Sequence, residues 1–298
     1  MSKASWLVDF PQMDRADLLF IRKTLDGAYK NFSRSYGDVI ESLFDPLLYF
    51  LVWFEKLLVN SPWWIIIAII CGLVFSATRS WKLTLGVLIA FLLIGYFGMW
   101  ENTMRTMSII FVCTLISIAV GIPIGIMMSR SDRAQSIVTP ILDIMQTMPA
   151  FVYLIPVVML LGIGKVPGVI AVVIYAIPPV IRLTNLGIRL VDKEVLEAAT
   201  AYGASSRQRL FGVQLPLALP TIMAGINQTI MMALAMVVIA SMIGVKGLGQ
   251  PVLRSITNQY FTIGLFNGLA IVALAIVFDR VSQAYGKRTQ RHLEGAQQ

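Results

Sequence analysis

Seven long apolar runs constrain the fold of this chain more than any other feature of its sequence. Each run has about 16 to 25 residues and almost no charge, which is close to the roughly 20 residues that an α-helix needs to cross a bilayer. The whole chain is 57% hydrophobic and 13% charged, too apolar for a soluble globule. We therefore expect an all-α polytopic membrane protein with about seven transmembrane helices, at residues 62–78, 81–100, 107–128, 148–164, 166–181, 221–245 and 261–278.

The positions of Lys and Arg predict how these spans are oriented. If the polar loop at 190–219 lies in the cytosol and the spans alternate, thirteen basic residues fall in cytosolic segments and four in exterior loops. This places the N-terminus outside and the C-terminus in the cytosol. The net charge of +8 is spread between apolar runs instead of forming one surface, so we expect contact with membrane lipids and none with nucleic acid.

The first 61 residues differ from the rest, with seven basic and eight acidic residues. We expect an extracytoplasmic tail over 1–61, a transmembrane domain over 62–286 and a basic cytosolic tail over 287–298. Residues 47–54 are strongly apolar but too short to span. Two interpretations remain open for them: a helix lying in the membrane interface, or a half-buried segment packed on the bundle.

A polar interruption at residues 190–219 has the pattern of a docking element. Asp192 is a suitable N-cap for a helix over 193–202, and Gly203 stands where a helix end needs a left-handed conformation. Ser205 or Ser206 can begin a second short helix, which we expect the 215–216 Leu-Pro pair to end. This predicts a charged helix–turn–helix on the water side of the membrane.

The spacing of residues in this loop resembles the signature of the membrane subunits of ABC importers. That signature is Glu-Ala-Ala, three residues, Gly, nine residues, an aliphatic residue, one residue and Leu-Pro. The chain matches it at Glu197, Ala198, Ala199, Gly203, Val213, Leu215 and Pro216. The resemblance implies that the first loop helix couples the chain to a cytosolic ATPase.

Two proline-containing or polar stretches are candidates for a translocation pathway. Pro149, Tyr153 and Pro156 suggest a broken helix at the start of the fourth span, with a simple packing kink as the alternative. In the sixth span, the adjacent polar residues Asn227, Gln228 and Thr229 either line a water-filled path or bond to neighbouring helices. We expect the 178–179 Pro-Pro pair to end the fifth span.

Further stretches at 143–164 and 243–250 are similar to the osmoprotectant branch of these permeases, which transports glycine betaine, proline or choline, and the resemblance covers 62–286. It implies a five-helix type I importer core with an N-terminal extension, in a bacterial inner membrane. It also implies a permease homodimer, a cytosolic ATPase that holds ATP and Mg²⁺, and an extracytoplasmic substrate-binding protein. This chain would be a non-catalytic subunit with no cofactor or metal. The alternative is a self-contained secondary carrier or channel.

Overall fold

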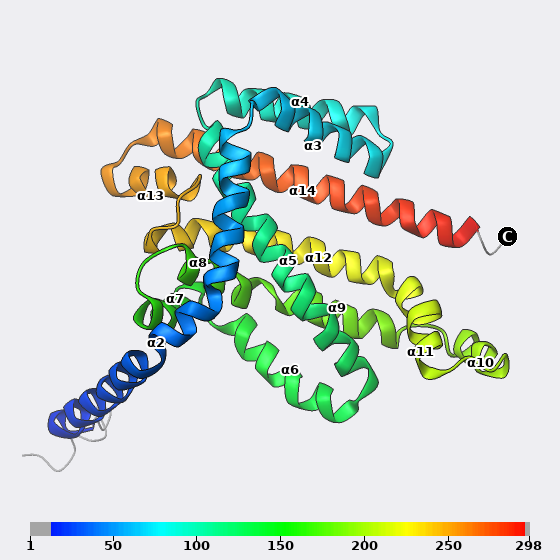
Figure 1. Ribbon diagram of the computed structural model, residues 1–298, viewed down its shortest axis with the longest axis horizontal. Coiled ribbons are helices and arrows are strands. Elements are labelled where there is room, and N and C mark those ends of the chain that lie inside the picture. Colours follow the sequence, from blue (N-terminus) through cyan, green and yellow to red (C-terminus); the bar gives the residue numbers. More distant parts are fainter. Residues whose placement is uncertain (1–12, 296–298) are drawn as a thin grey trace, which may run out of the picture.

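The computed structural model describes residues 13–295, apart from the side chains at 38, 41 and 287–295, and all elements in that part of the chain are helical (Figure 1). The predicted basic tail at 287–298 therefore lies outside the described side chains. In chain order the helices are α2 (Arg15–Asn60), α3 (Trp63–Thr78), α4 (Trp81–Tyr96), α5 (Trp100–Arg130), α6 (Asp132–Thr147), α7 (Ala150–Leu161), α8 (Lys165–Ala176), α9 (Pro178–Arg189), α10 (Lys193–Ala201), α11 (Ser206–Arg209), the π-helix η1 (Leu210–Gln214), α12 (Leu215–Ala240), the 3₁₀-helix η2 (Ser241–Ile243), α13 (Gly249–Asn258) and α14 (Phe261–Gly295).

Helix α12 is the centre of the bundle, and it packs against α9, α14, α8 and α5. Its buried face includes the small residues Ala218, Gly225, Ala233 and Ala240, which allow neighbouring backbones to approach closely. Helices α3 and α4 form a pair that lies along α14 (Figure 1). We call the two ends of the bundle the α10 end and the α13 end.

Helices α5 and α9 approach each other too closely for a side chain at one position. A Cβ atom added to Gly125 on α5 would lie 2.8 Å from the carbonyl oxygen of Ile181 and 2.6 Å from the Cβ of Thr184, both on α9. Contacts this short do not occur between real atoms, so glycine is required for the observed packing.

Within the described residues, four helical segments are long and apolar enough to cross a membrane: Trp100–Arg130, Lys165–Arg189, Ser206–Ile243 and Phe261–Gly286. Two bent pairs raise this to as many as six, because α2–α3 bends by 109° and α6–α7 by 100°. Helix α4 is a shorter apolar helix. Each of the seven predicted apolar runs thus contains helix, and the predicted all-α membrane class is confirmed.

The predicted fourth span was wrong in its extent. Helix α7 has 12 residues, about 18 Å, which is too short to cross a bilayer alone. It follows α6, which the apolar runs did not include because Asp132, Arg133 and Asp143 lower its hydropathy. A crossing at this place needs both helices, joined at the bend before Pro149.

Helix α8 ends at Ala176, just before the Pro-Pro pair at 178–179, but the apolar segment does not end there, contrary to our prediction. Pro178 and Pro179 begin α9, where the first backbone N–H groups need no partner within the helix. Ile177 between α8 and α9 keeps a right-handed helical conformation, so the segment continues to Arg189.

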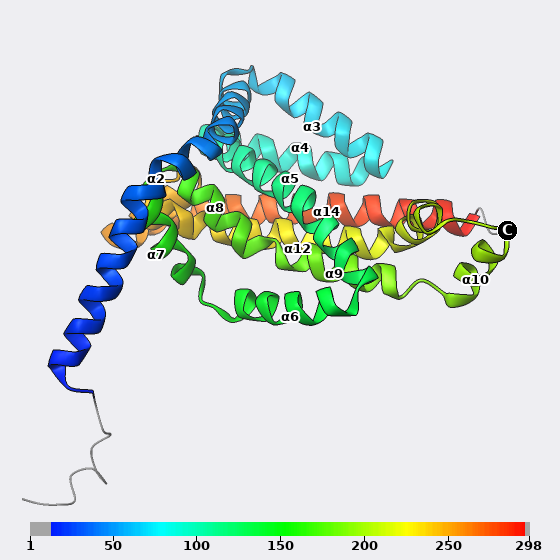
Figure 2. The same ribbon diagram turned by 60° about the horizontal axis from the view of Figure 1, so that its bottom comes forward.

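Helix α2 crosses the α13 end of the bundle instead of running along it (Figure 2). Its second half packs against α5, and Leu51 is 1% exposed in the main core. Residues 47–54 are therefore part of a 46-residue helix, and of the two interpretations left open by the sequence, packing on the bundle describes Leu51.

Candidate coupling surface and pathway residues

Helix α10 is built by the local signals that its sequence carries. The Asp192 carboxylate accepts a hydrogen bond from the backbone N–H of Glu194 at 3.0 Å and so caps the first turn. At the other end Gly203 has φ +79°, and the N–H of Ala204 donates to the carbonyl of Ala199 at 3.0 Å. This confirms the predicted helix and its glycine-dependent end.

All nine residues of α10 are exposed or half-exposed, so the helix presents every face to its surroundings. Tyr202, directly after it, is 93% exposed, and Glu197 is also exposed. One side of α10 borders a shallow hollow of about 390 Å³ that Lys193, Leu196, Glu197, Thr200, Ala201 and Arg209 line. A helix that is capped at both ends yet packs on little of its own chain is suited to contact another protein.

Contacts from outside the Glu-Ala-Ala pattern hold α10 in place. Arg209 Nη1 donates to the hydroxyl oxygen of Thr200 at 2.9 Å. Ser205 and Gln208 form a capping box that starts α11, and Arg130 Nη2 from the end of α5 donates to the Ser206 hydroxyl at 2.6 Å. These contacts were not predicted from the sequence, although the Ser-x-x-Gln spacing is a recognisable capping signal.

The second half of the motif begins α12 and does not end a helix, so this prediction was wrong. Val213 and Leu215 are half-buried, and Pro216 stands in the first turn of α12. Because Pro216 lacks an N–H and its ring crowds the carbonyl of Gly212, regular α-helical bonding is interrupted here. The N–H of Leu215 instead donates to the carbonyl of Leu210, five residues back.

The result is an almost continuous helical path, Ser206–Ile243, from the exposed loop into the centre of the bundle. Leu210, Ala218 and Ile222 along this path are buried in one cluster with Ile188 of α9. This cluster packs η1 and the start of α12 against α9 through buried side chains.

Two ion pairs join α6 to α9. Arg182 of α9 pairs with Asp143 of α6. Arg189 Nη2 contacts Asp132 at 2.7 Å and the carbonyl oxygen of Met128 at 2.9 Å. The sequence alone does not pair Asp143 with Arg182, because the two residues lie 39 positions apart.

Of the pathway candidates at the break, Tyr153 has a clear structural role. Its side chain is buried, and its hydroxyl donates to the carbonyl of Met145 on α6. This bond crosses the bend between α6 and α7. Pro149 precedes α7 as its N-cap, and Pro156 lies inside α7 with its carbonyl accepting from Tyr29 of α2.

The three polar residues of α12 point to different surroundings. Asn227 Nδ2 donates to Asp279 Oδ1 of α14 at 2.9 Å. Thr229 is fully buried, and Gln228 is exposed. Bonding to a neighbouring helix thus describes Asn227, and lining of a water-filled path stays a prediction for Gln228.

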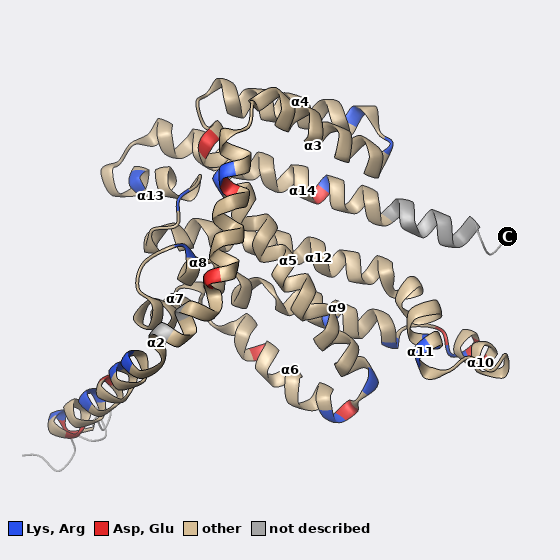
Figure 3. Cartoon of the chain, viewed as in Figure 1, with Lys and Arg blue, Asp and Glu red and all other residues tan. Residues whose placement is uncertain are grey.

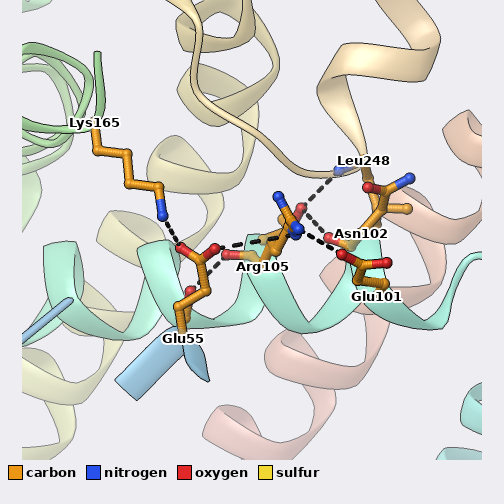
Figure 4. Close-up of polar contacts among 8 residues, drawn as sticks. Glu55, Glu101, Asn102, Arg105, Lys165 and Leu248 are labelled. Carbon is orange, nitrogen blue, oxygen red and sulfur yellow. Dashed lines mark hydrogen bonds and ion pairs between the residues drawn. The ribbon is translucent and has the colours of Figure 1, made fainter. Parts of the chain in front are cut away.

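Helix α12 and the middle of α5 carry no charged residue, while charged positions lie at both ends of the bundle and also along α6, α9 and α14 (Figure 3). At the α13 end Glu55 of α2 is only 8% exposed and lies between two cations (Figure 4). Lys165 Nζ of α8 is 2.6 Å from Glu55 Oε2, and Arg105 Nε of α5 is 4.0 Å from Glu55 Oε1. Arg105 and Lys165 lie 50 and 110 positions from Glu55, so the sequence alone does not connect them with it.

Next to this cluster, Thr106 of α5 accepts a hydrogen bond from the backbone N–H of Leu248 at 2.8 Å (Figure 4). The loop before α13 is thereby fixed to α5. Among the described residues, His, Cys, Asp and Glu form no group of three or more that could hold a metal ion.

A family model described as "Binding-protein-dependent transport system inner membrane component" matches residues 121–291. ProW of Escherichia coli K12, a glycine betaine/proline betaine transport system permease, is 48% identical over 257 residues, covering 85% of this chain and 71% of ProW. OpuAB of Bacillus subtilis 168, a glycine betaine permease, is 50% identical over 72% of this chain and 78% of its own length. The glycine betaine/carnitine permease GbuB of Listeria monocytogenes is 42% identical over 91% of this chain and 95% of its own length.

Among solved structures, a chain of the MetNI methionine ABC transporter in an inward-facing conformation matches with a TM-score of 0.57. The match covers 62% of this chain and 93% of that chain at 19% sequence identity. At this identity the likeness concerns the fold alone.

Proposed function

Because the chain belongs to the family of binding-protein-dependent transport system inner membrane components, we propose that it is the membrane subunit of an ATP-driven importer of glycine betaine and related quaternary ammonium compounds. The support for this substrate class is the printed function of three relatives that are 42% to 50% identical. The chain itself is a multi-pass permease of the inner membrane and not an enzyme.

The observation that carries the proposal is the exposed, doubly capped helix α10 within the family's loop pattern. In this proposal α10 binds a cytosolic ATPase, which holds ATP and Mg²⁺. The coupling residues are Glu197, Ala198, Ala199, Gly203, Val213, Leu215 and Pro216. The exposed Glu197 supplies a carboxylate for charge-assisted contacts with the ATPase, and Gly203 permits the turn.

Motion would pass from α10 to the bundle along Ser206–Ile243. Closure of two ATPase subunits draws two α10 helices together, and the path through η1 and α12 carries that movement to the membrane segment. The buried cluster around Leu210 and Ile222 supports this step, because packed side chains move together.

We propose that two copies of the chain enclose the pathway and that a substrate-binding protein delivers the ligand at the α13 end. This places the α10 end and the C-terminus in the cytosol and the N-terminal tail outside, as the Lys and Arg distribution favours. Gln228 on α12, which is exposed in the single chain, and Pro149 and Pro156 at the α6–α7 break are the pathway positions in this arrangement.

Reconstitution in proteoliposomes tests the function directly. Purified chain is incorporated with and without the candidate ATPase and binding protein, and uptake of radiolabelled glycine betaine and choline is measured. The proposal expects uptake only with all components and internal ATP. Uptake by the chain alone, driven by an ion gradient, would establish a secondary carrier instead.

A further inference from the structure

Helix α6 carries a polar face that is open in the structure. An α-helix turns by about 100° per residue, so residues spaced by three, four and seven share a face. By this geometry an arc of about 80° holds Asp132, Ser136, Thr139, Asp143 and Gln146, which we call the polar stripe of α6. Thr139 is half-buried and the other four side chains are exposed. From residue 132 to 146 the stripe extends about 21 Å along the helix axis.

The rest of the α6 surface is apolar. Leu142 is buried in one cluster with Ile181 of α9. On the remaining side Ile137, Ile141 and Ile144 are all exposed. The helix thus has one face for the bundle and one for an apolar layer, and the polar stripe is suited to water.

Two ion pairs set the depth of α6. Asp132 contacts Arg189 Nη2 at 2.7 Å, and Asp143 pairs with Arg182. Both arginines lie on α9, so α6 runs antiparallel to α9 at the same level of the bundle. The segment Lys165–Arg189 has 25 residues, about 37 Å, whereas the hydrocarbon core of a bilayer is about 30 Å thick. Arg182 is about 10 Å further into this segment than Arg189, which places the Asp143–Arg182 pair inside the membrane.

Open charge at this depth excludes lipid as the neighbour of the polar stripe. The side chains of Asp143 and Arg182 are 58% and 33% exposed. Charged groups inside a bilayer face the interior of a bundle or a water-filled cavity. The other side of the bundle shows the contrast: on α3 and α4, away from α6, the exposed side chains at 63–73 and 85–96 are all apolar or aromatic (Figure 1). The side of the bundle with the polar stripe is therefore the side that meets water.

The Asp143–Arg182 pair also has unused binding capacity. Arg182 Nε is buried and has no hydrogen-bond partner among the described residues. Buried polar atoms of a purely structural contact are normally hydrogen-bonded. A guanidinium carries five N–H donors in a planar fork that matches a carboxylate. Rotation of the Arg182 side chain toward the open side would therefore let it hold a second carboxylate next to Asp143.

We propose that the polar stripe of α6 lines the translocation path and that the Asp143–Arg182 pair is a binding site for a small zwitterion within it. Arg182 binds the carboxylate of the ligand, and Asp143 lies beside its quaternary ammonium group. Glycine betaine carries both groups, and its trimethylammonium group has no N–H, so a neighbouring carboxylate recognises it by charge alone. The identity of the zwitterion rests on the proposed function, whereas the water-facing stripe does not.

A zwitterion fits the pair better than a simple cation does. Choline has the same trimethylammonium group but no carboxylate, so it offers Arg182 nothing in exchange for the water that it displaces. An arginine and an aspartate side by side are neutral together, and they complement both ends of a ligand that is also neutral overall.

Thiol labelling of the full chain in nanodiscs tests the water-facing stripe. In a Cys71→Ala background, with Cys113 fully buried, the single variants Ser136→Cys and Ile141→Cys place a thiol on the polar stripe and on the exposed apolar face. The probe is a water-soluble methanethiosulfonate that carries a trimethylammonium group. We expect the Ser136→Cys variant to react at least about tenfold faster, because a thiol in apolar surroundings forms little thiolate.

Two labelling results would overturn the proposal. Equally slow reaction of both variants would show that lipid or a second chain covers the stripe. Equally fast reaction would place the whole of α6 in water, outside the membrane.

Neutral substitution of the pair tests the binding site. The double variant Arg182→Gln/Asp143→Asn leaves no unpaired charge, so thermal stability should stay close to that of the parent chain. In proteoliposomes with the ATPase and the binding protein, we expect uptake of glycine betaine to be at least about tenfold slower, the ratio expected for one lost charge-assisted hydrogen bond. ATP hydrolysis stimulated by the loaded binding protein should stay at the parent level.

The matched control is Arg189→Gln/Asp132→Asn, which removes the other ion pair between the same helices. Asp132 is 90% exposed, and we expect near-parent uptake. Equal loss of uptake in the two double variants would show that the pairs act only by holding α6 on α9. Parent-level uptake with the Arg182→Gln/Asp143→Asn chain would equally overturn the proposal.

Arg182→Lys decides the matter if the neutral pair lowers stability. Lys keeps the charge and the contact with Asp143 but lacks the planar fork, so the proposal expects slower uptake, whereas a structural pair predicts uptake at the parent level. Absence of ATP-driven uptake by the parent complex would count against the proposed function instead, and the labelling result would then decide whether the stripe faces water.

Discussion

Arg209 of α11 donates a hydrogen bond from Nη1 to the hydroxyl oxygen of Thr200 of α10, at 2.9 Å. The two residues line the same hollow as Lys193 and Glu197. Arg209 is not one of the residues of the loop pattern, yet its side chain joins the two loop helices. The orientation of α10 relative to α12 therefore depends on a residue that the motif does not contain.

Replacement of Arg209 by Ala should lower the rate of ATP-driven uptake without lowering the amount of protein that is expressed. The lost bond has a net value of about 1 kcal/mol, enough to loosen α10 without unfolding a bundle whose core lies elsewhere. We expect a several-fold lower rate of ATP-driven uptake in proteoliposomes with normal amounts of protein. Arg207→Ala is the matched control, because Arg207 is on the same short helix and is exposed. Equal uptake by the two variants would contradict the role of Arg209.

Replacement of Gly203 by Val should uncouple ATP hydrolysis from transport. The φ of +79° at this position is strongly disfavoured for a β-branched residue, while a Cβ would meet no atom within 4 Å, so any effect comes from the backbone. Asn tolerates this conformation, and Gly203→Asn should keep most of the activity. Substrate-stimulated ATPase activity and uptake are measured together, and normal values of both for the Val variant would refute the prediction.

Replacement of Glu55 by Gln should destabilise the chain. It leaves Lys165 and Arg105, whose side chains are 26% and 22% exposed, without their shared carboxylate. Breaking a fully buried ion pair costs about 3–5 kcal/mol, and this partial exposure reduces the expected loss to about 1–3 kcal/mol. Thermal unfolding in detergent measures this loss of stability.

The control for Glu55 is Glu101→Gln, because the Glu101 side chain is 61% exposed and surface pairs contribute about 0–1 kcal/mol. In a second step, Lys165→Met added to Glu55→Gln should recover part of the loss, since it removes one unpaired cation. A double variant less stable than the single one would show that Glu55 acts through other contacts.

Replacement of Tyr153 by Phe separates a packing role from a pathway role. Phe keeps the buried ring but loses the bond to Met145 across the α6–α7 bend, so we expect a loss of about 1 kcal/mol in stability. The apparent affinity for glycine betaine should stay unchanged, because the hydroxyl is bonded within the chain. Tyr175→Phe, on the neighbouring ring, is the control. A lower substrate affinity with unchanged stability would assign Tyr153 to the pathway.

Local signals in the sequence predicted local structure well. The Asp192 cap, the end of α10 and the left-handed Gly203 each depend on residues within a few positions, and all three are confirmed. The apolar runs predicted the helical class for the same reason, because bilayer thickness fixes the length of a span.

Features that depend on distant partners could not be predicted in this way. The pairing of α6 with α7 was missed because Asp143 makes α6 look polar, and its partner Arg182 is known only from the fold. The Leu215-Pro216 pair was expected to end a helix, but Pro in the first turn begins α12. Hydropathy describes how strongly a residue prefers water to an apolar phase. It does not show which charged residues form ion pairs in the fold.

The wide turn η1 has a mechanical consequence. A π-helical turn holds one residue more than an α-helical turn, and one residue in an α-helix corresponds to about 1.5 Å of length and about 100° of rotation. A change of η1 to α geometry would therefore act as a screw, in which axial travel and twist occur together. Through η1, a push on the loop and a rotation of α12 inside the bundle would be one movement and not two.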